Sequence, residues 1–240
     1  MDIALIGLLT FLASIAGTLS SFGASTIMVA VLLMFYPLTQ VLLLVAIIHW
    51  FDDLWKMILF RKGMRWLLII GFAVPGVAAS YAGARTTITI PEKAVFTFLG
   101  LVLIVYASYL IFHPLFRLPQ NLLTAAAGGT LSGFMAGIMG MGGAARGAFL
   151  TIYDLPKEVY IATSGAIAIL IDSARIATYH TEGVRLTVLS GKGLGIYIPL
   201  SFAGAAAAKY LAGRIPQKHY RTFIAAVLIT VGVKFLLFGG

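Results

Sequence analysis

Long runs of apolar residues, separated by short polar stretches, extend along the whole chain. Six of these runs are 17 to 24 residues long, which is the length that a helix needs to cross the hydrocarbon core of a bilayer. They lie at residues 37–60, 66–84, 94–112, 159–179, 193–211 and 222–238. The pattern therefore predicts an all-α integral membrane protein with three spanning helices in each half.

Two further apolar segments, residues 3–36 and 122–153, are too long to be simple spans. Each would extend over roughly 50 Å as one helix, whereas the hydrocarbon core measures about 30 Å. Glycines and small residues interrupt both segments near the middle. Each segment is therefore predicted to be broken, either as a re-entrant hairpin of two half-helices or as a single irregular crossing.

The two broken segments begin two related halves of the chain, residues 1–116 and 117–240. AGTLSSFGA at residues 16–24 matches AGIMGMGGA at residues 136–144. The same order continues, at a shift of 119 residues, in the pairs Pro37 and Pro156, Asp53 and Asp172, and Lys56 and Arg175. Preserved order and spacing indicate an internal repeat, an organisation typical of secondary transporters.

The basic residues between the spans favour the re-entrant alternative. With re-entrant hairpins, one face of the membrane carries eight of them, at Arg61, Lys62, Arg65, Arg117, Lys157, Arg214, Lys218 and Arg221. The other face then carries four, at Arg85, Lys93, Arg185 and Lys192. This imbalance follows the positive-inside rule, whereas full crossings place six on each face. We expect six crossings, two halves of inverted topology and both termini outside, with an eight-crossing bundle as the alternative.

Composition agrees with a membrane location and excludes several classes of protein. The chain is 60% hydrophobic and 10% charged, has no cysteine and carries a formal net charge of +9. Without a long basic run, this charge indicates topology signals and attraction to the cytoplasmic leaflet rather than a nucleic-acid partner. The apolar N-terminus carries an acid instead of the basic residues of a signal peptide, so we expect it to be retained. We predict a multi-pass protein of the cell membrane, the plasma (inner) membrane of a bacterium or archaeon.

The sequence offers little for catalysis. Histidines and acidic residues within the apolar runs are too few for general acid–base chemistry. No metal-ligand helix motif, phosphate-binding loop or nucleophile elbow occurs. We therefore expect no enzymatic activity, no cofactor and no metal site.

The two breaks are candidates for an anion site. A half-helix that starts near the membrane midplane directs unpaired N–H groups and the positive end of its dipole to that point. The first break supplies Ser21, Gly23, Ala24, Ser25 and Thr26, and the second supplies Gly142, Gly143, Ala144, Ala145 and Arg146. The arginine adds a planar cation suited to oxyanions. The alternatives are helix packing for the glycines and an ion pair between Arg146 and Asp53 or Asp172.

A repeated acid–base pair, Asp53-x-x-Lys56 and Asp172-x-x-Arg175, is the second candidate. A spacing of three places both side chains on one helix face within reach of each other. One interpretation is a buried structural ion pair that fixes the halves against each other. The other is proton coupling, in which Asp53 or Asp172 takes up a proton as the substrate moves, with His49 as a relay partner.

These features resemble the TauE/SafE sulfite exporter family, also called the TSUP permeases, over essentially the whole chain. The closest resemblance lies in AGIMGMGGAARGAFLTIYDLPKEVYIATSGAIAIL, residues 136–170, and in the weaker counterpart AGTLSSFGASTIMVAVLLMFYPLTQ, residues 16–40. The family pattern of a glycine turn, a half-helix, a proline and an Ala-Thr-Ser start is met by Gly140, Gly142, Gly143, Pro156, Ala162, Thr163 and Ser164. Two departures are SSFGAS, where a fuller glycine cluster is usual, and Arg146, where many members have an uncharged residue.

The resemblance implies transport of small sulfur-containing anions, such as sulfite or organosulfonates, without an attached ATPase. Together with the repeat, it predicts a secondary transporter that exports its substrate by alternating access around a midplane site, with proton coupling as one option. An anion channel without coupling, built from the same opposed helix ends, is the alternative. The expected partners are the anion and the lipid bilayer, while the oligomeric state stays open.

Overall fold

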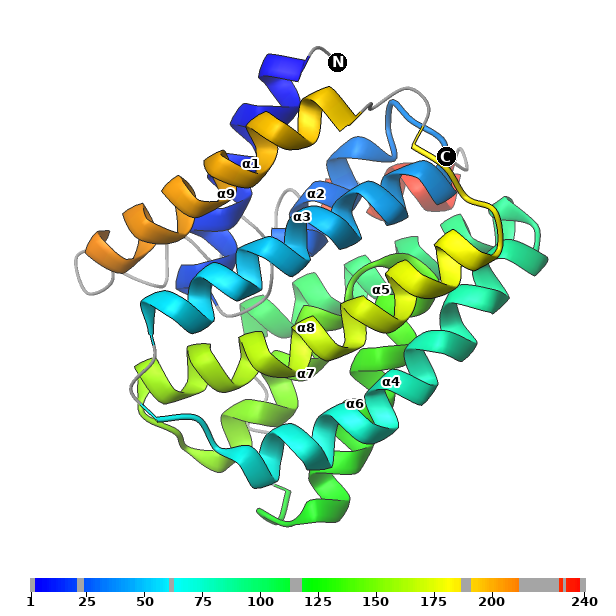
Figure 1. The fold of residues 1–240 in the computed structure, drawn as a ribbon. Helices are drawn as coiled ribbons and strands as arrows, with labels where there is room; N and C mark the ends of the chain where they lie inside the picture. Colours follow the sequence, from blue (N-terminus) through cyan, green and yellow to red (C-terminus); the bar gives the residue numbers. More distant parts are fainter. Residues whose placement is uncertain are drawn as a thin grey trace.

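The protein is a bundle of helices in a computed structural model that describes residues 3–20, 24–60, 63–112, 118–186, 191–211, 229–230 and 232–237. Within these ranges the regular structure is helical and contains no strand, which confirms the all-α class. The elements are α1 (Ile3–Ser20), α2 (Ala24–Leu32), α3 (Leu38–Leu59), α4 (Trp66–Thr89), α5 (Glu92–Phe112), α6 (Leu122–Met139), α7 (Gly142–Leu150), the 3-10 turn η1 (Thr151–Tyr153), α8 (Lys157–Thr181) and α9 (Gly191–Leu211) (Figure 1). Four of them, α4, α6, α8 and α9, are long and apolar enough to span a membrane.

Most helices agree with the predicted spans, and α4 differs at its end. This helix continues to Thr89, five residues beyond the predicted boundary at Ala84. Arg85 lies on its exposed side and reaches Glu182 after α8, with 3.1 Å between Arg85 Nε and Glu182 Oε1. The charge of Arg85 therefore does not end α4. The helix ends just before Pro91 because a residue that precedes proline is disfavoured in the helical conformation.

The second broken segment is a hairpin. Helix α6 ends at Gly140, whose φ of 71° reverses the chain direction and favours glycine. Helix α7 then runs back along α6, and Ser132 Oγ donates a 2.9 Å hydrogen bond to the carbonyl of Gly142. At the other end of the hairpin, the hydroxyl of Tyr153 donates to the carbonyl of Asn121 at 2.6 Å. The segment therefore returns to the end of the molecule from which it started.

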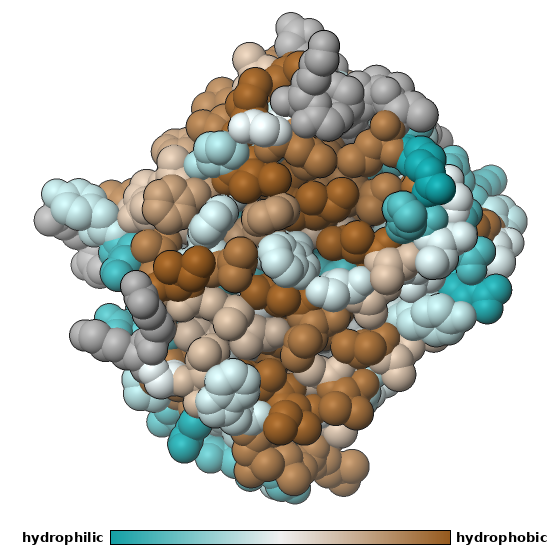
Figure 2. All heavy atoms as spheres, viewed as in Figure 1, coloured by the Kyte–Doolittle hydropathy of each residue, from teal (hydrophilic) through white to brown (hydrophobic). Residues whose placement is uncertain are grey.

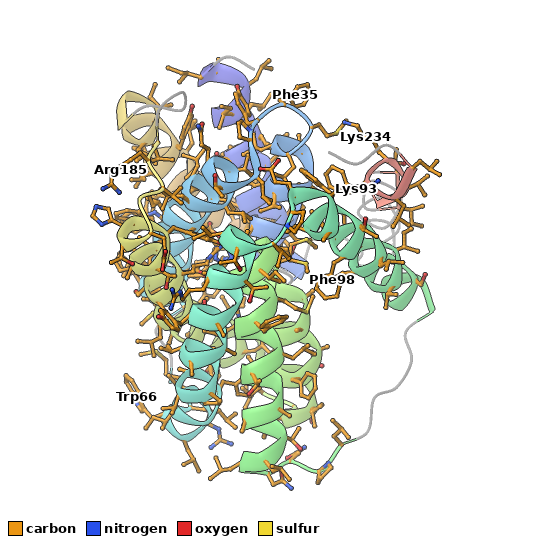
Figure 3. All side chains as sticks on the ribbon, turned by 90° about the vertical axis from the view of Figure 1, so that its right-hand side faces the viewer. Phe35, Trp66, Lys93, Phe98, Arg185 and Lys234 are labelled. Carbon is orange, nitrogen blue, oxygen red and sulfur yellow. The ribbon has the colours of Figure 1, made fainter. Side chains whose placement is uncertain are left out.

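The first broken segment is likewise divided into two helices, α1 and α2. Figure 1 shows the start of α1 at the top, and Figure 3 shows Phe35, which follows α2, at the same end. Trp66 lies at the opposite end, where it lines one cavity with Asn121 and Tyr153 of the second hairpin. The two hairpins thus open toward opposite ends of the molecule. Ser21 and Gly23, and most of the predicted span 222–238, lie outside the described residues.

The halves are interleaved rather than separate. Helix α4 of the first half packs on α6 of the second, and α9 of the second half packs on α1 of the first. The equivalent helices α3 and α8 pack against each other in the middle. Helix α5 contacts the described part of the last predicted span through Phe96 and Phe235, whose ring centroids are 5.2 Å apart. The largest helix contacts between the halves therefore have counterparts with the roles of the halves exchanged, α4 on α6 with α9 on α1 and α4 on α8 with α9 on α3.

Small residues allow the close approach of α4 and α6. A Cβ added at Gly129, Gly133 or Gly137 of α6 would fall on the backbone carbonyl of Phe72, Gly76 or Ser80 of α4, respectively. This spacing of four is typical of membrane helices whose backbones touch. Close helix packing therefore accounts for Gly129, Gly133 and Gly137.

Much of the surface is apolar, and charged side chains are buried inside the bundle beside an apolar core. Brown, hydrophobic residues cover much of the face in Figure 2, and exposed residues of α4 include Leu67, Ile70 and Val74. Charged side chains are buried between the middle helices instead. Since a soluble domain has the opposite distribution, this arrangement fits a bundle that is surrounded by lipid.

Candidate functional site

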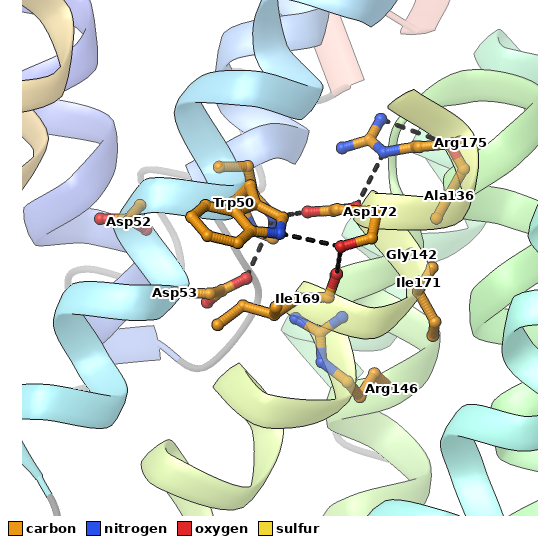
Figure 4. A network of polar contacts seen from close by, with 12 residues as sticks. Trp50, Asp52, Asp53, Ala136, Gly142, Arg146, Ile169, Ile171, Asp172 and Arg175 are labelled. Atoms are coloured by element: carbon orange, nitrogen blue, oxygen red, sulfur yellow. Dashed lines mark hydrogen bonds and ion pairs between the residues drawn. The ribbon is translucent and has the colours of Figure 1, made fainter. Parts of the chain in front are cut away.

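A cluster of charged side chains lies buried between α3, α7 and α8 (Figure 4). Its members are His49, Asp52, Asp53, Lys56, Arg146, Asp172 and Arg175. The repeated Asp-x-x-basic pairs are both part of it, as equivalent positions on the two equivalent helices α3 and α8. Burial of so many charges is expensive unless each is compensated, so the partners of each one matter.

Lys56 is held by two carboxylates of its own helix. Its Nζ atom lies 2.6 Å from Asp52 Oδ2 and 2.9 Å from Asp53 Oδ1. These spacings of four and three along α3 place all three side chains on one face. The predicted pair of Asp53 and Lys56 is therefore formed, and the structure adds Asp52 as a second partner of Lys56.

Arg175 ties Asp172 to the second hairpin. Its Nε donates to Asp172 Oδ1 at 2.8 Å, and its Nη1 lies 3.4 Å from the carbonyl of Ala136 in α6. The hydroxyl of Tyr179, one turn further along α8, donates to the carbonyl of Gly137. The ion pair of Asp172 and Arg175 is therefore also formed, and it is anchored to the last turn of α6.

His49 connects the two carboxylates across the halves. Its Nδ1 atom lies 2.7 Å from Asp172 Oδ2 and 3.1 Å from Asp53 Oδ2. The three atoms have the composition of a metal site and lie within 4.8 Å of one another. Lys56 and Arg175 already neutralise the same two carboxylates, however, so a divalent cation would add uncompensated positive charge. We therefore interpret the group as a hydrogen bond from Nδ1–H of His49 to Asp172 Oδ2, with Asp53 Oδ2 close to the same nitrogen but without a hydrogen bond.

Arg146 differs from the other two cations in its partners. The side chain, from α7, is only 3% exposed, and its Nε donates a 2.9 Å hydrogen bond to Ser164 Oγ of α8. Within the described part of the chain it forms no ion pair with a carboxylate. Asp53 and Asp172, the two partners that the sequence suggested, are taken by Lys56, Arg175 and His49.

Arg146 lines a small cavity between the halves. The other lining residues are Gly17, Thr18, Asp53, Lys56, Tyr160, Ile161 and Ser164. The space accommodates about one water molecule. Among the described residues, the buried hydroxyl of Thr18 has no hydrogen-bond partner. Two cations and two hydroxyl groups, Thr18 and Ser164, therefore surround a space in which a small anion would find donors on several sides.

The sequence identified only part of this cavity. Arg146, Asp53 and Lys56 line it as candidates already named, whereas Thr18, Tyr160 and Ser164 were not proposed as ligands. Ser164 belongs to the Ala-Thr-Ser motif that was noted for the family resemblance, and this was the available signal. Thr18 gave none, because a threonine in an apolar helix is indistinguishable from a packing residue until its neighbours are known.

The other predicted anion ligands are buried away from the cavity. Ala24, Ser25 and Thr26 begin α2, while Gly142, Gly143, Ala144 and Ala145 form the first turn of α7. None of these residues lines the cavity, and Gly142 packs against Ser132 and Ala136 of α6. Helices α2 and α7 contact each other, so the two half-helices do meet. The role of their ends in binding stays a prediction.

Comparison with known protein families agrees with this architecture. The model of the family described as "Sulfite exporter TauE/SafE" matches residues 6–235, nearly the whole chain. The chain belongs to the TauE/SafE sulfite exporter family. No curated protein and no solved structure matches it significantly.

Membership of the TauE/SafE family establishes the general class of activity. The family consists of membrane transporters of sulfite and related sulfur-containing anions, and it is not a family of enzymes. The several apolar helices fit a multi-pass membrane protein. The buried cluster and the cavity at Arg146 are therefore the polar interior of a TauE/SafE transporter.

Proposed function

We propose that this protein is a secondary transporter of a small sulfur-containing oxyanion, sulfite or an organosulfonate, which binds at Arg146. The observation that carries the proposal is a buried arginine without a carboxylate partner, next to a cavity. A buried arginine that contacts no carboxylate costs several kcal/mol at this depth, and an anion bound directly to its guanidinium would offset that cost. Arg146 Nη1 and Nη2 provide the planar donor pair that suits two oxygens of an oxyanion.

The neighbouring side chains suit the same ligand. Lys56 adds a second positive charge, while the hydroxyls of Thr18 and Ser164 add donors from α1 and α8. Both halves of the chain therefore contribute to the site. Asp53 on the cavity wall repels any bound anion, which favours a substrate of low charge.

The size of the cavity favours a carrier over a channel. Sulfite is larger than the one water molecule that the cavity accommodates, so the anion has to enter by rearrangement of the surrounding helices. The exchanged packing of α4 on α6 and of α9 on α1 provides two similar units that can rock against each other. We propose alternating access on this basis. We propose export as the direction because the family is described as sulfite exporters, with the outward gradient of the anion as its driving force.

Flux through proteoliposomes tests the function. Radiolabelled sulfite and methanesulfonate should exchange across membranes that contain the protein, and the rate should saturate with substrate concentration because binding at Arg146 precedes movement. Protein-free liposomes give the background leak. Flux that rises without saturation would favour a channel, and no flux of either anion above background would overturn the proposal.

The hairpin geometry supports six crossings in two halves of inverted topology, with the richer set of basic residues inside. Single-cysteine labelling tests this arrangement directly, because the protein has no cysteine of its own. In intact cells, an impermeant maleimide should label Glu182→Cys but neither Gln120→Cys nor Glu158→Cys; labelling after membrane disruption gives the control. Eight crossings would instead place positions 120 and 182 on one side and position 158 on the other.

A further inference from the structure

The bridge at His49 lies where the two halves meet, and the geometry fixes one of its protons. Nδ1 lies between an oxygen of Asp53 and an oxygen of Asp172, at 3.1 and 2.7 Å. Both oxygens are acceptors, so Nδ1 has to carry a hydrogen to interact favourably with them. Any change in the charge of His49 therefore occurs at the other ring nitrogen, Nε2.

Nε2 is available for that change. It is buried, and within the described residues it has no hydrogen-bond partner. In the neutral ring it is a free acceptor, which is the form that can take up a proton. The two aspartates are less suited to this role because a proton on Asp53 or Asp172 would weaken the ion pair with Lys56 or Arg175.

The sum of the buried charges indicates that protonation of His49 is favourable when an anion is bound. The described buried side chains include three carboxylates, Asp52, Asp53 and Asp172, and three cations, Lys56, Arg146 and Arg175. With neutral His49 the empty cluster is therefore balanced. A bound monoanion would leave one uncompensated negative charge in the low-dielectric interior, and a proton on His49 would cancel it.

We infer that His49 carries one proton for each anion that the protein moves, so that anion and proton travel together without net charge. This inference rests on the proposed function and assigns its coupling group. The proton binds at Nε2 while Nδ1–H stays between Asp53 and Asp172, which then stabilise the imidazolium from both halves. The aspartates remain ionised throughout, in contrast to the proton-carrying role that the sequence suggested for them.

The groups that face His49 are consistent with this role. Asp52, Asp53 and Lys56 lie on its own helix α3, and Asp172 and Arg175 lie on α8. Arg146, from α7, faces the same region (Figure 4). Asp52 and Asp53 are the competing proton acceptors, since Oδ1 of Asp52 and Oδ2 of Asp53 have no hydrogen-bond partner among the described residues and the two carboxylates share Lys56.

Anion accumulation in proteoliposomes tests the inference. The potential is clamped at zero with potassium and valinomycin, the outside is acidified, and labelled methanesulfonate is used because it stays a monoanion. Hydrogen sulfite, at a pH where it is the main species, is the second probe. Coupling of one proton to one anion should concentrate the anion inside about tenfold for each pH unit of gradient. An imposed potential at equal pH should concentrate neither probe.

Substitution of His49 separates coupling from transport. His49→Asn keeps an amide donor near the position of Nδ1 but cannot titrate, so exchange of anion should persist at a reduced rate while accumulation driven by pH is lost. Net flux should then follow the membrane potential. His180→Asn, at an exposed histidine near the end of α8, is the matched control and should retain tenfold accumulation.

The outcomes are distinct. Flux in the unmodified protein that follows the potential and ignores the pH gradient would overturn the inference while the proposed function stands, and this result needs no variant. The inference would also be overturned if His49→Asn retained accumulation driven by the pH gradient, or if Asp52→Asn lost this accumulation while His49→Asn did not. If neither probe moves in the unmodified protein, the proposed function fails and the inference fails with it.

Discussion

Replacing Arg146 by Gln should lower saturable anion flux by about 100-fold or more while destabilising the unliganded protein much less than the loss of Arg175 does. Loss of a buried charged partner of a ligand typically costs about 2–5 kcal/mol of binding free energy, a range that includes the 100-fold loss expected here. Stability falls less than on loss of Arg175 because Arg146 contacts no carboxylate among the described residues, so its replacement breaks no ion pair. Flux in proteoliposomes and the melting temperature in detergent measure the two effects.

Arg175→Gln is the matched control for that experiment, since it removes an equally buried arginine from the same cluster. It should destabilise the protein by about 3–5 kcal/mol, because Asp172 loses its ion pair, and lower the melting temperature by roughly 10 °C. Arg146→Lys should bind the anion with intermediate strength, since it keeps the charge without the planar donors. A melting temperature that falls as far in Arg146→Gln as in Arg175→Gln would identify Arg146 as a structural partner instead.

Gly133→Ala should destabilise the bundle by about 3 kcal/mol or more, which lowers the melting temperature by roughly 10 °C. The added Cβ would fall on the backbone of Gly76, so α4 and α6 have to separate. Backbone atoms cannot move aside as a flexible side chain can. Because α4 and α6 belong to different halves, the change should also weaken the contact between the halves, measured as increased protease sensitivity in detergent.

Gly195→Ala provides the control for the effect of glycine replacement as such. This glycine also lies within a helix, α9, but a Cβ there meets no atom within 4 Å. Its replacement should leave the melting temperature unchanged or raise it slightly, because alanine is the better helix former. Equal destabilisation by the two changes would contradict the close-packing explanation for Gly133.

The sequence predicted the elements of the fold because each follows from local composition. Apolar runs indicated the helices, and the glycines near residue 140 indicated a break that the structure shows as the turn at Gly140. Hydropathy alone placed the end of α4 before Arg85, whereas the helix continues to Thr89 and ends just before Pro91. The family resemblance rested on the same local motifs, and the match to residues 6–235 confirms it.

The candidate site was predictable only in part. The pairs of Asp53 with Lys56 and of Asp172 with Arg175 follow from a spacing of three on one helix. The partner of Arg146 does not follow from spacing, since Asp53, Asp172 and substrate were all possible before the folded arrangement was known. Thr18 illustrates the same limit, because it reaches the cavity from a helix more than a hundred residues away from Arg146.

The sequence by itself determined that the chain is a helical membrane protein, and it predicted two related halves with a break in each. These properties depend on apolar length and on glycine, which act over neighbouring residues. Tertiary structure alone decided that the halves interleave, that His49 joins Asp53 to Asp172, and that Arg146 is left without a carboxylate. The reason is that each carboxylate has only two oxygens. The fold therefore decides which cations and which histidine contact these oxygens, and which cation has no carboxylate contact and can bind an anion.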